Sequence, residues 1–119
     1  DGFVTVVDRL KELIITGGFN ISPSEVEDAL LLDPDIVDAA VVGIPRADGG
    51  EAVAAAVVMR EGAVFEPERI RETARAHLAA YKVPRSITRF DELPRSMVGK
   101  VLRREVRDEL VRRRQKGTT

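Results

Sequence analysis

The centre of the chain reads IVDAAVVGIPRADGGEAVAAAVVM over residues 36–59. Its first nine residues are mostly small or branched and apolar, which is typical of a buried strand. Residues 45–50 contain a proline and two glycines and predict a turn-rich loop. Residues 51–59 predict another strand, whose alanines indicate close packing against a neighbour. The sequence therefore predicts two successive strands in the middle of the chain.

Further strands are predicted on both sides of this centre. Residues 3–7 and 12–16 are rich in branched apolar residues and lie close enough in the chain to form a hairpin-like pair. Gly17 and Gly18 follow, where the backbone can take conformations closed to other residues. Residues 86–90 predict the last strand.

Three segments predict helices. The first begins with Ser22 as the expected N-cap, Pro23 at N1 and Glu25 completing a capping box, and residues 33–35 end it. Its expected apolar face consists of Val26, Ala29, Leu30 and Leu32.

The second predicted helix covers residues 67–80, with Ile70, Ala74 and Leu78 on one face. The third covers residues 105–114, and residues 115–119 are expected to fray. The predicted order is β-β-α-β-β-α-β-loop-α. It describes a small α+β domain, in which a mixed sheet is flanked by helices and preceded by a two-stranded β-ribbon.

The composition limits the classes of protein to consider. The chain has 119 residues, 44% hydrophobic and 33% charged, which suits one globular domain with a modest core. No apolar run approaches the length of a membrane span, and the start shows no signal-peptide pattern. Cysteine is absent, so disulfides are excluded and a cytoplasmic location is expected. His77 is the single histidine and is expected to be structural or solvent-facing. No metal site is therefore predicted.

The formal net charge of −1 is unevenly distributed. Residues 95–119 contain nine basic and three acidic residues, or +6, which leaves ten basic and seventeen acidic residues, or −7, for residues 1–94. The basic segment would suit nucleic acid, membrane lipid or a phosphorylated small molecule. We interpret Arg112, Arg113 and Arg114 as a solvated helix end, where cations favour the helix dipole.

A loop that offers one lysine precedes the last predicted helix, with the sequence LPRSMVGKVLR over residues 93–103. Pro94 cannot continue a helix, and Gly99 permits a tight turn before Lys100. Lys100 is therefore expected where an irregular loop meets a helix or short strand, a position that suits an anionic partner. The alternative is an ordinary surface lysine, because the spacing P-x4-G-K is short and common.

Three segments together resemble one known family. They are residues 8–11 with 17–27, residues 39–45 with Gly50 and Glu51, and residues 81–84 with 93–103. In this order they resemble the C-terminal domain of the acyl-adenylate-forming enzymes, which include acyl-CoA synthetases, nonribosomal peptide adenylation domains and firefly luciferases. The resemblance implies that residues 1–10 end a larger N-terminal domain and form the ribbon and hinge region. Residues 11–119 would be the mobile domain of a longer chain.

The resemblance also implies a role for individual residues. Lys100 matches the catalytic lysine of adenylation, Arg9 an arginine that contacts the nucleotide, and Lys11 the hinge. The substrates would be ATP and CoA, with Mg²⁺ expected in the full-length enzyme but not bound by this domain. An exposed Lys100 would be open to acetylation, which removes its charge. Unchanged ATP–pyrophosphate exchange after acetylation would contradict that switch.

Four residues match the family's thioester-forming face. Gly17 and Gly18 match a turn beside the thiol tunnel, and Tyr81 and Arg85 match positions where some ligases contact CoA. More general interpretations remain open: Arg9 as a strand-end charge, the glycines as a simple turn, and Tyr81 as an interface ring.

The resemblance therefore implies the C-terminal domain of an AMP-forming acyl-CoA synthetase, inactive by itself and partnered by its own N-terminal domain. An adenylation domain that loads a carrier-protein thiol is the enzymatic alternative. The non-enzymatic alternative is a basic nucleic-acid-binding module. No nucleic-acid partner is expected, because the basic segment has no aromatic residues on which bases could stack.

Overall fold

The computed structural model describes residues 13–47 and 49–117, with side chains up to Arg114. The strand predicted at residues 3–7, together with Arg9 and Lys11, lies outside the described residues. The main sheet has the order β3-β4-β5. β3 (Ile36–Pro45) and β4 (Glu51–Met59) pair antiparallel, and β5 (Ser86–Arg89) runs parallel to β4. The mixed sheet expected from the sequence is therefore confirmed.

The described ribbon includes a strand that the sequence analysis did not predict. β1 (Ile14–Thr16) pairs antiparallel with β2 (Phe19–Ile21), so Gly17 and Gly18 are the two residues of its turn. Their φ angles of 55° and 85° lie in the left-handed region that favours glycine. Positive φ at both central residues is what a tight hairpin turn requires, and the Gly-Gly pair was the signal for it. The expected partner of β1, residues 3–7, is not described.

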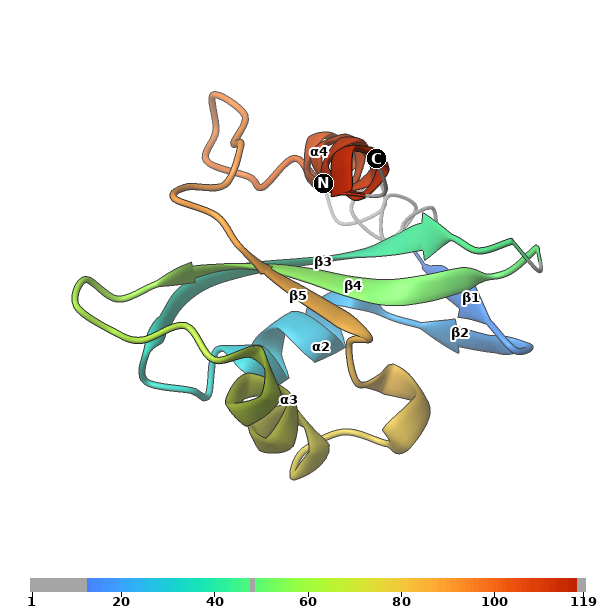
Figure 1. Ribbon diagram of the computed structural model, residues 1–119, viewed down its shortest axis with the longest axis horizontal. Helices are drawn as coiled ribbons and strands as arrows, with labels where there is room; N and C mark the ends of the chain where they lie inside the picture. The colour runs from blue at the N-terminus through green and yellow to red at the C-terminus, as the bar shows by residue number, and fades with distance from the viewer. Residues whose placement is uncertain (1–12, 48, 118–119) are drawn as a thin grey trace.

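Helices cover both faces of the main sheet (Figure 1). α2 (Pro23–Leu30) and α3 (Pro67–Arg75) lie on one face, and α4 (Arg103–Gly117) lies on the other. Alternate side chains of β3 and β4 divide between the two cores. Ala39 and Val41 belong to the core under α2 and α3, whereas Val42 packs with Val106 and Leu110 of α4.

Two details of α2 differ from the prediction. Ser22 is the N-cap and Pro23 occupies the first turn, but the Ser22 side chain makes no capping hydrogen bond. The capping box is therefore wrong, and Glu25 instead pairs with Lys82. Leu32 is 59% exposed because the helix ends at Leu30, before Leu32 can join the apolar face.

The other two helices differ from the prediction in their ends. α3 ends at Arg75, five residues before the predicted end, and a 3₁₀ turn, η1 (Ala80–Lys82), follows after a short turn. Ile70 and Ala74 are buried as expected, and Leu78 packs against the same core from outside the helix. α4 is longer than predicted at both ends.

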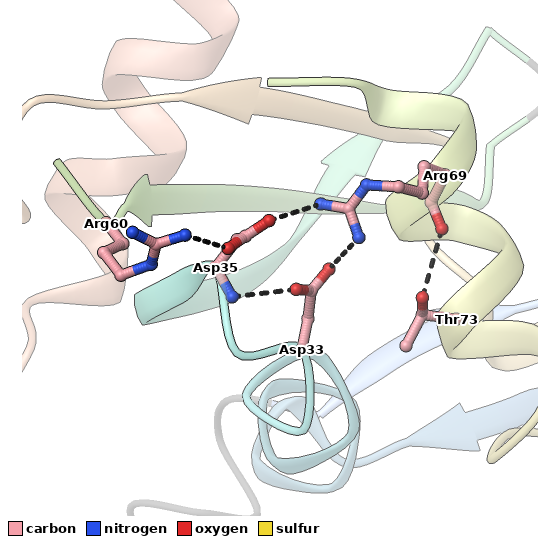
Figure 2. A network of polar contacts seen from close by, with 5 residues as sticks. All are labelled: Asp33, Asp35, Arg60, Arg69 and Thr73. Atoms are coloured by element: carbon pink, nitrogen blue, oxygen red, sulfur yellow. Dashed lines mark hydrogen bonds and ion pairs between the residues drawn. The ribbon is translucent and has the colours of Figure 1, made fainter. Parts of the chain in front are cut away.

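A buried carboxylate joins α2, β3 and α3 (Figure 2). Asp33 is 1% exposed, accepts a hydrogen bond from the Asp35 backbone N–H at 2.9 Å and pairs with Arg69 Nη1 at 2.9 Å. Arg69 also reaches Asp35 at 3.5 Å, and Arg60 pairs with Asp35 at 2.7 Å. The turn between α2 and β3 is thus fixed to α3.

We expect Asp33→Ala to lower the free energy of unfolding by about 2–3 kcal/mol, because it removes the acceptor of the part-buried Asp35 N–H and the closer of the two carboxylates that hold Arg69. Urea unfolding of the chain measures the loss. Asp28→Ala, which removes an exposed carboxylate from α2, is the matched control and should change stability little. Equal losses in the two variants would contradict the role given to Asp33.

Candidate functional site

Lys100 lies on a short hairpin between β5 and α4, which we call the Lys100 hairpin (residues 94–102). Arg95 and Val101 form an isolated antiparallel bridge. The Ser96 N–H donates to the Lys100 carbonyl at 2.8 Å, and the Lys100 N–H donates to Ser96 Oγ at 3.3 Å. Gly99 has φ 85°, so the turn before Lys100 requires glycine. Lys100 is therefore exposed on a hydrogen-bonded turn.

The base of the Lys100 hairpin is tied to the sheet. Arg95 forms an ion pair with Asp38 of β3 and donates from Nη1 to the Gly99 carbonyl at 2.6 Å. Leu93, just before the hairpin, is buried in the core under α4. These contacts hold the backbone around Lys100 in place while its side chain stays exposed.

A second anchor holds the chain immediately after Lys100. Arg103, the first residue of α4, donates from Nε and Nη2 to the two carboxylate oxygens of Glu27 at 2.8 and 2.6 Å. Glu27 Oε2 also accepts the Val41 N–H of β3 at 2.8 Å. β3 is an edge strand of the described sheet, so no described strand accepts a hydrogen bond from the Val41 N–H. The Glu27 carboxylate accepts it instead. No sequence signal pointed to this link, because its partners are 76 residues apart.

We expect Glu27→Ala to destabilise the chain by about 2–3 kcal/mol, because a largely buried guanidinium and an edge amide lose their acceptor. Hydrogen exchange of the Val41 amide should become faster at the same time. Glu109→Ala is the control, since Glu109 also holds two arginines, but at an exposed place on α4. Unchanged protection of Val41 in Glu27→Ala would contradict the contact.

The glycine turn lies beside an aromatic pair, of which the sequence analysis singled out only Tyr81. Phe19, the residue after Gly18, stacks on Tyr81 with ring centroids 4.2 Å apart and planes inclined by 22°. Both rings remain about half exposed. A Cβ at Gly17 or Gly18 would meet nothing within 4 Å in this domain, so the turn borders open space. Gly17, Gly18 and Tyr81 are thus brought together, and Phe19 is the member that sequence reasoning missed.

The connector after Tyr81 is braced by ion pairs and hydrogen bonds. Lys82 Nζ lies 2.8 Å from Glu25 of α2, and this hydrogen bond raises the pKa of the Lys82 ammonium above its ordinary value. Arg71 of α3 donates to the carbonyls of Pro84 and Arg85, each at 3.1 Å. The position of Tyr81 therefore depends on both α2 and α3.

Arg85, the fourth predicted thioester-face residue, lines a pocket of about 400 Å³. Arg71 and Arg75 line the same pocket, and on α3 they pair with Glu68 and Glu72. A larger groove of about 780 Å³ lies at the base of the Lys100 hairpin, but three carboxylates, those of Asp38, Asp91 and Glu92, line it. The first pocket therefore offers phosphate oxygens more cationic groups than the second, where Arg95 is the one cation of the lining and pairs with Asp38.

The two groups of predicted residues lie far apart. In Figure 1 the β1–β2 turn and the hairpin before α4 project from opposite sides of the molecule. Lys100 belongs to one side, whereas Gly17, Gly18 and Tyr81 belong to the other. The two groups therefore border different parts of the domain surface.

The arginines near the end of α4 are largely engaged within the domain. Hydrogen bonds from Arg112 and Arg113 lower the pKa of Glu109 to about 2. Arg113 also lies over the Phe90 ring at 4.3 Å, and Arg114 donates to the Pro45 carbonyl at 3.2 Å. Their side chains are nevertheless exposed, in keeping with the predicted solvated helix end.

Two further observations concern metals and membranes. In the part of the chain that the structure describes, no three His, Cys, Asp or Glu side chains gather as a metal site would need. His77 is exposed to solvent, one of its two expected positions. No helix within the described ranges is long and apolar enough to span a bilayer.

Comparison with known proteins identifies the class of domain. The family model described as AMP-binding enzyme C-terminal domain matches residues 25–100. The chain belongs to this family, as the combined motifs implied.

Individual relatives make the comparison more specific. A long-chain-fatty-acid–CoA ligase from Yersinia pestis is 45% identical over 112 residues, which are 94% of this chain and 20% of the relative. An acyl-CoA synthetase from Brucella canis superposes with a TM-score of 0.81 at 34% identity, over 89% of this chain and 20% of that one. The amide bond synthetase McbA from Marinactinospora thermotolerans superposes with a TM-score of 0.80 at 40% identity, over 86% and 21%. The chain thus spans about a fifth of the length of these proteins.

Proposed function

We propose that the chain is the mobile C-terminal domain of an AMP-forming acyl-CoA synthetase. The parent enzyme would join a carboxylic acid to ATP as an acyl-adenylate and then transfer the acyl group to CoA. The observation that carries this proposal is the separation of the two groups of site residues on opposite sides of one domain. Two half-reactions at one centre, served by a domain that rotates between them, make use of this arrangement. The relatives' names support the reaction class.

Lys100 would serve the first half-reaction. A carboxylate oxygen of the acid attacks the α-phosphorus of ATP, the new P–O bond forms, and the bond to pyrophosphate breaks. The Lys100 ammonium would contact carboxylate and phosphate oxygens and stabilise the charge that shifts between them, keeping its own protons throughout. The braced hairpin supports this role, because a fixed backbone leaves less reorganisation for the transition state.

The glycine turn would serve the second half-reaction. The thiolate sulfur of CoA attacks the acyl carbonyl carbon, and the bond to AMP breaks. Gly17 and Gly18 would leave room for the thiol arm, while Tyr81 offers a ring face and Arg85 a cation for the nucleotide end of CoA. The basic pocket that Arg71 and Arg75 share with Arg85 supports this assignment.

The rest of the parent enzyme would supply the remaining parts. Mg²⁺ would accompany ATP there, and the isolated chain should show no ATP–pyrophosphate exchange. Arg9 as nucleotide contact, Lys11 as hinge and a cytoplasmic location stay predictions.

The acceptor thiol is also a proposal. The relatives named as CoA ligases favour CoA, although McbA, an amide bond synthetase by name, indicates that acceptors differ among similar structures. Competition between free CoA and an acyl carrier protein would separate the two thiols. A nucleic-acid-binding role has less support, because the arginines at the end of α4 already contact groups of this domain.

We expect Lys100→Ala in the full-length parent to reduce ATP–pyrophosphate exchange by at least about a hundredfold, because a charge-stabilising contact is lost. Thioester formation from supplied acyl-adenylate and CoA should survive. Arg89→Ala, which removes an exposed cation from the end of β5, is the control and should leave both rates unchanged. Survival of exchange in Lys100→Ala would refute the assignment.

Three glycines allow a matched test of the two groups of site residues. Gly18, Gly62 and Gly99 all have φ 85°, and a Cβ at each meets nothing within 4 Å. Alanine should therefore cost each variant a similar backbone strain of about 1–2 kcal/mol. Beyond that shared cost, Gly18→Ala should slow thioester formation and Gly99→Ala should slow adenylation. Gly62→Ala should slow neither, and equal effects of all three on both rates would contradict the two-face arrangement.

A further inference from the structure

The tip of the Lys100 hairpin carries two apolar side chains that nothing in this domain covers. Met97 is 105% exposed and Val98 is 88% exposed. The next most exposed large apolar side chain in the described ranges, Val64, reaches 67%. Isolated exposed apolar residues are ordinary on protein surfaces, but two adjacent ones at full exposure on one projecting turn are not.

The hairpin geometry keeps these side chains in solvent. The Gly99 N–H donates to the Ser96 carbonyl at 2.9 Å, and the Leu102 N–H donates to the Pro94 carbonyl at 2.9 Å. Together with the Arg95–Asp38 ion pair, these bonds prevent the tip from folding back onto the sheet. In Figure 1 the segment between β5 and α4 stands away from the domain. The apolar tip is therefore held outward by the same contacts that hold Lys100.

Resting on the proposed function, we propose that Met97 and Val98 dock in an apolar socket on the larger remaining part of the parent enzyme during adenylation. This contact sets how deeply Lys100 enters the reaction centre, so Met97 and Val98 are positioning residues. The socket must border that centre, because three residue steps separate Met97 from Lys100 and span at most about 11 Å.

Two observations point to this occupant, and the second test below separates it from a second copy and from a lipid surface. The relatives are about five times as long as this chain, so in the proposed parent a large neighbouring surface would belong to the same polypeptide. The hairpin also places its apolar tip and its cation within one short turn. A socket beside an anionic substrate would match both features.

The first test uses the double variant Met97→Ser/Val98→Ser in the full-length parent. ATP–pyrophosphate exchange should fall by about tenfold to a hundredfold, because the apolar contact is lost. Thioester formation from supplied acyl-adenylate should stay within about twofold of the parent rate. Met97→Leu/Val98→Ile should restore exchange, and Val64→Ser is the matched control that should leave it unchanged.

Each other outcome overturns the inference in a distinct way. Unchanged exchange in the serine variant means that the tip stays in solvent. Loss of both half-reactions means that the contact is not specific to adenylation. If Met97→Leu/Val98→Ile also exchanges slowly, burial of apolar surface is not what adenylation requires from the tip.

The second test detects the contact by the oxidation of Met97 and needs no measurement of activity. Methionine oxidises where it is exposed, and the chain has two methionines, Met97 and the buried Met59. With hydrogen peroxide as the probe, Met97 in the parent should oxidise at least about tenfold more slowly with a non-reactive acyl-adenylate analogue than with AMP and CoA. Met59 should oxidise slowly in both mixtures. Equal oxidation of Met97 in the two mixtures, or protection that needs lipid vesicles or higher protein concentration, would overturn the proposal.

The variants distinguish failure of the docking inference from failure of the proposed function. If Lys100→Ala abolishes exchange and the serine variant does not, the docking inference fails and the proposed function stands. If Lys100→Ala leaves exchange intact, the site assignment fails and this inference fails with it.

Discussion

The β3–β4 pair presents apolar side chains on both of its faces, and the rest of the domain follows from the need to cover them. Val41 faces α2 and α3, while Val42, its neighbour in the chain, faces α4. A sheet of three strands cannot hide either face by itself. A small side chain on β3, Ala40, lets α4 approach that strand closely. The helices are therefore arranged as two layers around a thin sheet.

Because both faces are covered, function is left to the edges and connections. The Lys100 hairpin leaves the sheet after β5 and is fastened by Arg95 before the lysine and by Arg103 after it. Arg103 reaches Glu27 on α2, so the pair crosses the edge of β3 and joins the two helical layers. The lysine that we assign to adenylation thus stands between two anchored points, and its side chain is exposed at the surface of the domain.

The sequence predicted most elements but not all of their partners. The strands of residues 36–59 were recognisable because nearly every residue in them is small or branched. The β1–β2 hairpin was missed, although Gly17 and Gly18 marked its turn, because residues 12–16 also suit pairing with residues 3–7. The capping box failed for a different reason: Glu25 has Lys82 within reach, and sequence spacing cannot reveal a partner 57 residues away.

By itself the sequence determined the local features of this protein: the apolar strands, the glycines where φ is positive, the start of α2 at Pro23, and the motifs that resemble the adenylate-forming family. These features depend on neighbouring residues, so spacing and residue type suffice to read them. Only the tertiary structure decided which side chains meet. The Phe19–Tyr81 stack, the Glu27–Arg103 pair and the separation of Lys100 from the glycine turn arise from contacts between distant segments, whose geometry the folded sheet fixes.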